Sequence, residues 1–122
     1  VGVAYKPAEG SWGANAFLDN ATGGSTASGR LDATINSSGT AIVAWSATAL
    51  GSPPQGQIRT VIRSKAGPWP ALNGYQTAFT EDLNTGGSGT SLACASGPAT
   101  AIDDTGRAII ACSSACADCR AV

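Results

Sequence analysis

The amino-acid sequence predicts an all-β protein made of antiparallel sheets, and three observations lead to that prediction. Ala, Gly, Ser and Thr fill 64 of the 122 positions, whereas Val, Ile, Leu, Phe, Trp and Tyr together fill only 25. The apolar runs are short, rich in β-branched residues and bounded by turn-forming residues, as is typical of strands. No stretch combines a 3.6-residue apolar period with helix caps, so no long helix is expected.

The chain contains an internal repeat of two units within a single region, residues 1–122. Four sequence blocks occur twice in the same order, at offsets of 57 to 68 positions, which chance does not explain. The longest pair is Ile35–Ser46 and Ile102–Ser113. Unit 1 therefore covers about residues 1–55 and unit 2 about residues 56–122, with the Gly- and Pro-rich segment Gly51–Gly56 as their boundary.

The first strand of each unit is expected over Val1–Tyr5 and over Gln57–Arg63. Both stretches alternate apolar residues with others and are bounded by Gly and Pro, which is the pattern of a half-buried strand. The Gly-rich segments 20–29 and 84–90 lack this pattern, so we expect loops there.

Each unit is expected to end in a β-hairpin. Asn36–Gly39 and Asp103–Gly106 have the residue types of a tight turn, in which Gly accepts a positive φ. The runs Thr40–Trp45 and Arg107–Cys112 that follow are almost continuously apolar, which predicts interior strands buried on both faces. The expected strand pairs are Leu31–Ile35 with Thr40–Ser46 and Pro98–Ile102 with Arg107–Ser113.

Three features of unit 1 follow one another: a strand ending in a basic residue, the stretch Lys6–Trp12, and an Asn-x-x-Gly hairpin that ends at Trp45. In this order they resemble the tandem blade repeats of bacterial secreted β-propeller proteins. The resemblance covers about residues 1–113 and implies two propeller-blade-like repeats, without implying a function. Unit 2 departs from it at Cys112, which replaces the Trp, and nothing after residue 113 matches. A β-sandwich stapled by disulfides is the alternative fold.

Trp12 and Trp69 occupy equivalent positions in the two units. Each indole is expected either to pack between neighbouring sheets or to form a platform on which a sugar ring stacks, which makes these two residues the candidate ligand-binding site. Trp45, at the end of an apolar strand, is expected in the core.

Composition argues against several classes of function. The net charge of −1 excludes the basic footprint of a nucleic-acid-binding protein, and no apolar run is long enough to span a membrane. The chain has no His, and the adjacent acids Glu81 and Asp82, on an expected long loop, have no second acid at a spacing suited to glycoside hydrolysis. Asp103 and Asp104 fit a plain turn better than a calcium loop. We therefore expect no enzyme activity, no cofactor and no metal.

All four cysteines lie in unit 2, and an even number in a secreted chain favours two disulfides over a metal site or free thiols. If Ile102 faces Arg107, Cys94 falls near Cys116 across the hairpin, which leaves Cys112 to pair with Cys119. The alternative is Cys94–Cys112 with Cys116–Cys119. Asn20 and Asn36 each begin an Asn-x-Ser/Thr sequence, the acceptor pattern for N-glycosylation. We expect little glycosylation at either residue.

Taken together, the sequence predicts a non-catalytic extracellular structural or assembly module built from β repeats. Two units leave open sheet faces, so the module is expected to pack with other copies, as a homo-oligomer, or with the rest of a longer chain. The alternative is a carbohydrate-binding, lectin-like module that binds a glycan through Trp12 and Trp69.

Overall fold

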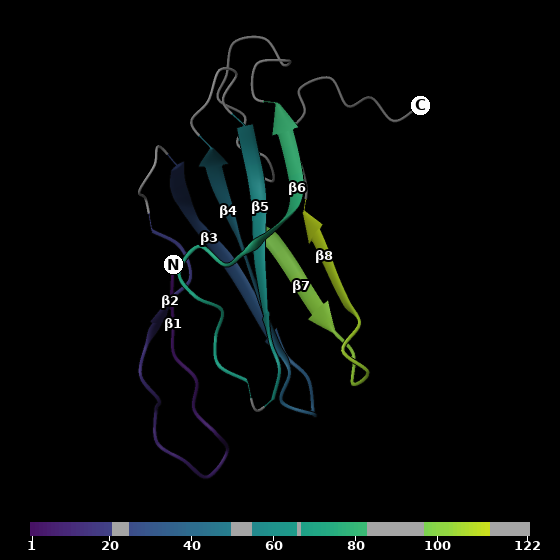
Figure 1. Ribbon diagram of the computed structural model, residues 1–122. Coiled ribbons are helices and arrows are strands. Elements are labelled where there is room, and N and C mark those ends of the chain that lie inside the picture. Colours follow the sequence, from purple (N-terminus) through teal and green to yellow (C-terminus); the bar gives the residue numbers. More distant parts are fainter. Residues whose placement is uncertain (21–24, 50–54, 66, 83–96, 113–122) are drawn as a thin grey trace.

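The structure is a computed structural model that describes residues 1–20, 25–49, 55–65, 67–82 and 97–112. Over these ranges the chain forms eight β-strands, all paired in antiparallel fashion, and no helix (Figure 1). The prediction of an all-β protein with antiparallel sheets is confirmed. The described strands form open sheets rather than a closed barrel or a propeller. In the same part of the chain, no helix is long and apolar enough to cross a membrane.

The centre of the molecule is a four-stranded sheet in the order β3-β4-β5-β6, so strands that follow one another in the sequence are neighbours. Two short hairpins accompany it, one formed by β1 and β2 and the other by β7 and β8. The strands are β1 (Gly2–Val3), β2 (Ala16–Phe17), β3 (Ser25–Ile35), β4 (Ala41–Ala49), β5 (Gln55–Arg63), β6 (Gln76–Asp82), β7 (Pro98–Ile102) and β8 (Ala108–Cys112).

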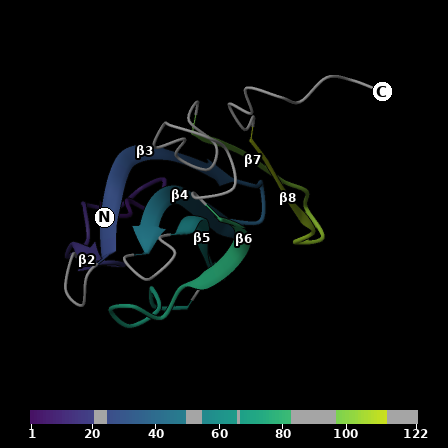
Figure 2. The same cartoon turned by 90° about the horizontal axis from the view of Figure 1, so that it is seen from above.

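The central sheet is covered on both faces, and each face carries its own apolar cluster (Figure 2). The N-terminal segment and the connection between β5 and β6 cover the first face. The β7–β8 hairpin covers the second face, where Ile110 packs against Ala44 and Ile58. The larger cluster, on the first face, consists of Leu18, Val43, Trp45, Ala47 and Val61, with Val1, Val3, Trp69 and Tyr75 packed against it.

Strand β4 is an interior strand, paired with β3 and β5, and Ala41 to Ala47 are all buried. Its odd-numbered side chains enter the first cluster and its even-numbered ones face the β7–β8 hairpin, so an almost uninterrupted apolar run is required. The prediction of an interior strand is therefore confirmed for Thr40–Trp45. For Arg107–Cys112 it is wrong: among the described strands β8 pairs only with β7, and four of its five residues are exposed.

Both predicted hairpins form, with turns of matching geometry. Gly39 and Gly106 adopt φ values of 85° and 87°. Each donates its N–H to the carbonyl oxygen of the residue three positions earlier, at an N···O distance of 3.0 Å. The first side chain of each turn closes it: Asn36 Oδ1 accepts the N–H of Thr40 at 2.8 Å, and Asp103 Oδ1 accepts that of Arg107 at 2.9 Å. An Asx residue at the start and a Gly at the end therefore have clear physical roles in both turns.

Three segments differ from expectation. Residues 25–29, expected in a loop, begin β3, because the β4 backbone pairs with them as far as Ser25 opposite Ala49. Glu81 and Asp82, also expected in a loop, end β6 against β5. Strand β5 belongs to the same sheet as β3 and β4, so units 1 and 2 share one sheet rather than forming separate ones. The expected loop 84–90 lies outside the described residues.

Candidate functional site

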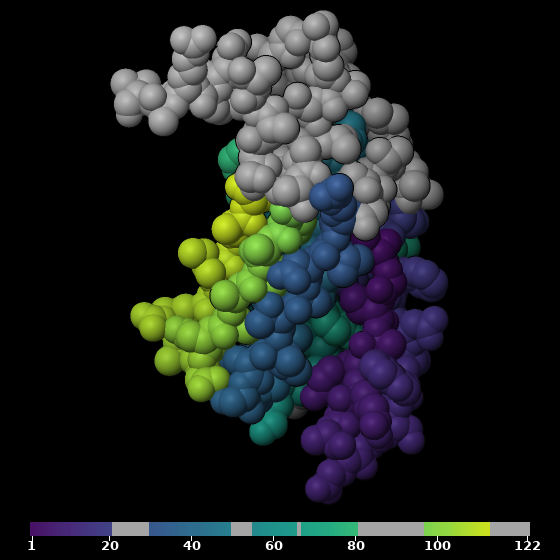
Figure 3. All heavy atoms as spheres, turned by 180° about the vertical axis from the view of Figure 1, so that it is seen from behind, coloured from purple at the N-terminus to yellow at the C-terminus, as the bar shows by residue number. Residues whose placement is uncertain are grey.

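An apolar groove of about 340 Å³ opens beside strand β3. One wall is the N-terminal segment, another is the β3–β4 hairpin, and the connection between β5 and β6 adds the last part. Figure 3 shows β3, in blue, with the N-terminal segment on one side and the β7–β8 hairpin on the other. Side chains from distant parts of the sequence therefore meet here; the groove is lined by residues that include Val3, Tyr5, Trp12, Ala33, Ile35 and Trp69.

The structure brings Trp12 and Trp69, the two candidate ligand-binding residues, to this groove but leaves them in different environments. Trp12 is 69% exposed, so the interpretation that it packs between sheets is wrong within this chain. Trp69 packs against the first apolar cluster, and its Nε1 is buried without a hydrogen-bond partner among the described residues. Trp45 is 1% exposed and lies in the core, as expected. Trp12 is therefore the accessible aromatic ring of the site.

Arg63, the last residue of β5, contacts two of the aromatic rings that line the groove. Its guanidinium carbon lies 4.1 Å from the centre of the Tyr5 ring and 5.6 Å from that of Trp69. A cation placed over an aromatic face is attracted by the partial negative charge on that face of the ring. Arg63 therefore fixes the N-terminal segment against the connection that carries Trp69, even though its Nη1 has no hydrogen-bond partner in the described part of the chain.

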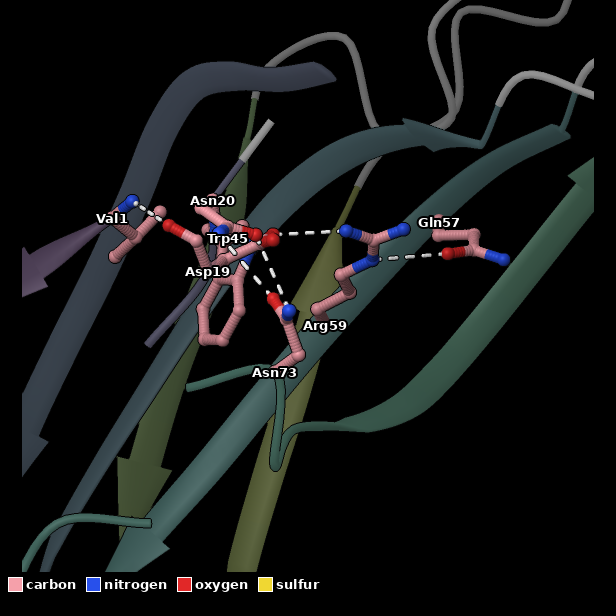
Figure 4. Close-up of polar contacts among 7 residues, drawn as sticks. All are labelled: Val1, Asp19, Asn20, Trp45, Gln57, Arg59 and Asn73. Atoms are coloured by element: carbon pink, nitrogen blue, oxygen red, sulfur yellow. Dashed lines mark hydrogen bonds and ion pairs between the residues drawn. The ribbon is translucent and has the colours of Figure 1, made fainter. Parts of the chain in front are cut away.

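A buried ionic network positions the N-terminal segment on the sheet (Figure 4). Asp19 Oδ2 accepts hydrogen bonds from Arg59 Nη1 at 2.9 Å and from Trp45 Nε1 at 2.8 Å. The side chains of Asp19 and Arg59 are only 2% and 4% exposed. The Arg59 guanidinium also lies over the Tyr75 ring, 4.4 Å from its centre. This network joins the segment after β2 to β4, β5 and the connection that precedes β6.

The sequence analysis did not single out Asp19, because nothing next to Asp19 in the sequence distinguishes it from the other acids of loops and turns. The available signal is Arg59, a charged residue between Ile58 and Thr60 in the middle of a strand. Arg at a central position in a sheet is buried only when it is paired, so one acidic residue had to reach it.

A pair of asparagines closes the same end of the N-terminal segment. Asn73 Nδ2 donates to Asn20 Oδ1 at 3.2 Å, and the Asn73 N–H donates to the carbonyl of Leu18 at 3.0 Å. Asn73 has a φ of 62°, in the left-handed region that Asn tolerates better than most residues. Asn20, the first of the two candidate glycosylation residues, therefore contacts Asn73 through its side chain.

The two repeat-equivalent hairpins lie against each other, and their turns are hydrogen-bonded. Asn36 Nδ2 donates to the carbonyl of Asp103 at 2.7 Å, and Ser37 donates from its N–H and its hydroxyl to Asp104 Oδ1 at 3.1 and 2.6 Å. Asn36 and Asp103 are the first residues of the two turns. Asn36, the second candidate glycosylation residue, therefore uses its side chain in a contact between the two units.

Farther along the strands, Asp32 and Thr34 continue this contact. Asp32 Oδ2 accepts from the N–H and the hydroxyl of Thr100 at 2.6 and 2.8 Å, and Thr34 Oγ1 lies 2.8 Å from Thr100 Oγ1. The hydrogen bonds from Thr100 lower the pKa of the Asp32 carboxyl. The polar contact between units therefore extends from the turns into β3 and β7.

The acids of the second turn are occupied by donors of this chain. Thr105 and Arg107 bind Asp103 through their side chains and lower its pKa from 3.8 to about 2. The Arg107 Nε lies 2.6 Å from Asp103 Oδ2. Over the described residues, no group of three or more Cys, Asp or Glu side chains is placed to hold a metal ion.

Cys112, the last residue of β8, is the one cysteine among the described residues. Strands β7 and β8 pair Ile102 with Ala108. The expected register, with Ile102 opposite Arg107, is therefore wrong by one residue, because Arg107 belongs to the turn and bonds back to Asp103.

The pairing of Cys94 with Cys116, and of Cys112 with Cys119, stays a prediction. Cys94, Cys116 and Cys119 lie outside the described residues.

No protein-family model, no curated protein and no solved structure matches this chain. The resemblance to tandem blade repeats therefore stays a prediction. The groove and the contact between the two hairpins are the features from which a function can be argued.

Proposed function

We propose that this protein is a non-catalytic structural module of the extracellular space, which assembles by stacking its β-hairpin repeats. The observation that carries the proposal is the contact between units. The turn Asn36–Gly39 lies on its repeat equivalent Asp103–Gly106, through hydrogen bonds from Asn36 and Ser37 to Asp103 and Asp104. A repeat whose own elements stack in this way has surfaces suited to stacking further copies.

Two further features support an extracellular assembly over an enzyme. The even number of cysteines, four, fits two disulfides formed in an oxidising compartment. The carboxylates of Asp19, Asp32 and Asp103 all accept hydrogen bonds from side chains of the same chain, which is the arrangement of acids that hold a structure together.

The proposal is tested by the association state of the purified, oxidised chain. Sedimentation velocity over concentrations from about 10 μM to about 1 mM should show dimers or larger species that grow with concentration. A single monomeric species over the whole range would contradict assembly through other copies. Thiol counting before and after reduction tests the extracellular part, since we expect no free thiol before reduction.

A second candidate function, glycan binding, has one specific observation in its favour. Trp12 and Trp69 line the same groove, and the Trp12 ring is accessible. An exposed indole offers a face on which a sugar ring can stack. The groove is mostly apolar, however, and offers few of the polar groups that would orient sugar hydroxyls.

Binding of the chain to a glycan array compares the two candidates. Glycan binding predicts a signal that the Trp12→Ala variant loses and the Phe17→Ala variant keeps, because Phe17 is a similarly exposed aromatic residue that does not line the groove. Absence of any signal for the unmodified chain would leave assembly as the favoured function.

A further inference from the structure

Repeat-equivalent residues of the two hairpins differ sharply in exposure. Ile42 on β4 is 1% exposed and Ala44 is fully buried at 0%, because the β7–β8 hairpin covers this face of unit 1. Their equivalents in unit 2 are Ile109 and Ala111, 67 positions later. Ile109 is 65% exposed and Ala111 is exposed as well. The face that unit 1 covers with a following hairpin is thus uncovered in unit 2.

The uncovered face is entirely apolar. Ala99 pairs with Ala111 and Ala101 with Ile109, so these four side chains share the side of the hairpin that points away from the central sheet. All four are exposed. We call this set, Ala99, Ala101, Ile109 and Ala111, the outer hairpin face.

The covered face of unit 1 is more polar than its equivalent in unit 2. Asp32 and Thr34, which bond to Thr100, stand at the positions that Ala99 and Ala101 occupy in unit 2. Whatever covers the outer hairpin face therefore meets no hydrogen-bonding side chain from these two positions and must itself be apolar.

A matching apolar surface exists on strand β3. Leu31 and Ile35 are 53% and 52% exposed, and Ala33 between them is exposed too. Because side chains alternate along a strand, these three lie on the face opposite to Asp32 and Thr34. We call Leu31, Ala33 and Ile35 the β3 strip; Ala33 and Ile35 also line the apolar groove.

The repeat relation connects these two surfaces. Within the chain, β7 presents Thr100 to β3 and β4 of unit 1, and β8 presents Ile110 to the cluster of Ala44 and Ile58. The residues of unit 1 that are equivalent to Thr100 and Ile110 are Ala33 and Val43. The β3 strip, which contains Ala33, is therefore equivalent to the side of the β7–β8 hairpin that contacts the central sheet. A third hairpin stacked in the same manner would therefore place a β3 strip on the outer hairpin face.

We propose that the outer hairpin face of one copy docks on the β3 strip of a second copy, with Ile109 entering the apolar groove beside Ile35. This inference rests on the proposed function and specifies its partner and its contact. The two surfaces differ, so the contact is head-to-tail: it leaves one free surface at each end, and copies add in a row or close into a ring.

The size of the outer hairpin face determines how tightly copies bind. Two paired strands of five residues measure roughly 17 by 10 Å, which is well below the ~800 Å² per partner of a stable interface. The contact between two copies is therefore weak and concentration-dependent, and the experiment has to reach high protein concentration.

Two charge-inserting variants test the head-to-tail contact. Ile109→Asp disables the outer hairpin face and Ile35→Asp disables the β3 strip; both side chains are exposed, so both variants should fold. By sedimentation velocity each variant alone should stay monomeric, with apparent affinity weakened about tenfold or more. An equimolar mixture should form a dimer and stop there, because only one intact pair of surfaces remains.

Matched controls make the result decisive. Ile62→Asp changes an isoleucine of similar exposure, 48%, outside both surfaces and should assemble like the unmodified chain. Far-UV circular dichroism and thermal unfolding verify that each variant folds, and Ala101→Glu supplies a second variant of the outer hairpin face.

Four outcomes overturn the proposal. Assembly of Ile109→Asp like the unmodified chain shows that the outer hairpin face is not used. Self-association of Ile35→Asp shows a symmetric contact between two outer hairpin faces. A mixture that stays monomeric rules out the pairing. A monomeric unmodified chain instead contradicts the proposed function itself, so the two failures are distinguishable.

Discussion

At the scale of single residues, one buried carboxylate joins parts of the chain that are far apart in sequence. Asp19 binds Arg59, 40 positions away, and Trp45, 26 positions away. Neither Asp19 nor Arg59 belongs to the few large apolar side chains, yet together they fix the N-terminal segment that forms one wall of the groove. In a core this thin, a satisfied ion pair takes a role that apolar packing has in larger proteins.

We expect Asp19→Asn to destabilise the protein strongly. The variant leaves the buried Arg59 guanidinium without a counter-charge, and breaking a buried pair costs about 3–5 kcal/mol of the free energy of unfolding. Urea unfolding followed by tryptophan fluorescence measures this loss. Glu9→Gln, at an exposed acid, is the control and should change stability by less than about 0.5 kcal/mol. Equal effects of the two substitutions would contradict the role of Asp19.

Two acids of the hairpins, Asp32 on β3 and Asp103 in the second turn, predict how stability depends on pH. The pKa of Asp103 is lowered from 3.8 to about 2, and that of Asp32 is lowered by its hydrogen bonds from Thr100. A carboxyl whose pKa is lower in the folded state stabilises the fold above its unfolded pKa, and this contribution is lost as the pH falls through the folded pKa. Thermal unfolding should therefore move to lower temperature between about pH 4 and pH 2.

The matched variant for this pH dependence is Asp32→Asn. It should unfold at a lower temperature than the unmodified chain at pH 6 and show a smaller change between pH 4 and pH 2, because one titrating group is gone. An unchanged slope would show that Asp32 does not contribute to the pH dependence.

At the scale of elements, the two hairpins have nearly the same turn and different surroundings. Gly39 and Gly106 adopt φ values of 85° and 87°, which favour Gly. A Cβ at Gly39 would lie 3.2 Å from Lys65 Cγ, whereas a Cβ at Gly106 would have no atom within 4 Å. The turn of unit 1 is thus packed and the turn of unit 2 is open.

We expect Gly39→Ala and Gly106→Ala each to destabilise the protein by about 1–2 kcal/mol, because both force Ala into the left-handed region. Gly39→Ala should cost more, since Lys65 must also move. Chemical unfolding of the two variants side by side measures the difference. A larger loss for Gly106→Ala would show that the open turn has a contact beyond those described.

At the scale of the whole molecule, one sheet carries elements of both repeat units, and the β7–β8 hairpin covers only one of its faces. Reduction of the predicted disulfides should therefore loosen unit 2 first, since all four cysteines lie in unit 2 and Cys112 ends β8. Losing a native disulfide typically costs about 2–5 kcal/mol. Hydrogen exchange is read by mass spectrometry with and without reductant. Reduction should raise the exchange rate more in β7 and β8 than in β4. Uniform change across all strands would contradict this expectation.

Peptide mapping of the oxidised chain tests the cysteine pairing. Cys94–Cys116 with Cys112–Cys119 is the expected result, and Cys94–Cys112 with Cys116–Cys119 is the alternative. Four free thiols would contradict both.

Local patterns in the sequence were enough to predict the class of fold, both hairpins and both turns. Asx residues and glycines act through bonds within four positions, and an apolar run such as Ala41–Ala47 requires cover on both faces wherever it lies. Strands β2 and β6 escaped prediction because they are short or rich in polar residues and depend on a neighbouring strand for their hydrogen bonds.

Contacts between distant segments decided the rest. Ile42 and Ile109 occupy equivalent positions in the repeat, yet Ile42 is buried and Ile109 is exposed. The β7–β8 hairpin covers the face of unit 1 that carries Ile42, whereas no described segment covers the equivalent face of unit 2. Trp12 and Trp69 likewise share a motif but differ in burial, and Asp19 looks like any other loop acid until Arg59 meets it. Burial depends on which segments end up side by side, and that arrangement is set by tertiary packing rather than by the residues next to each position.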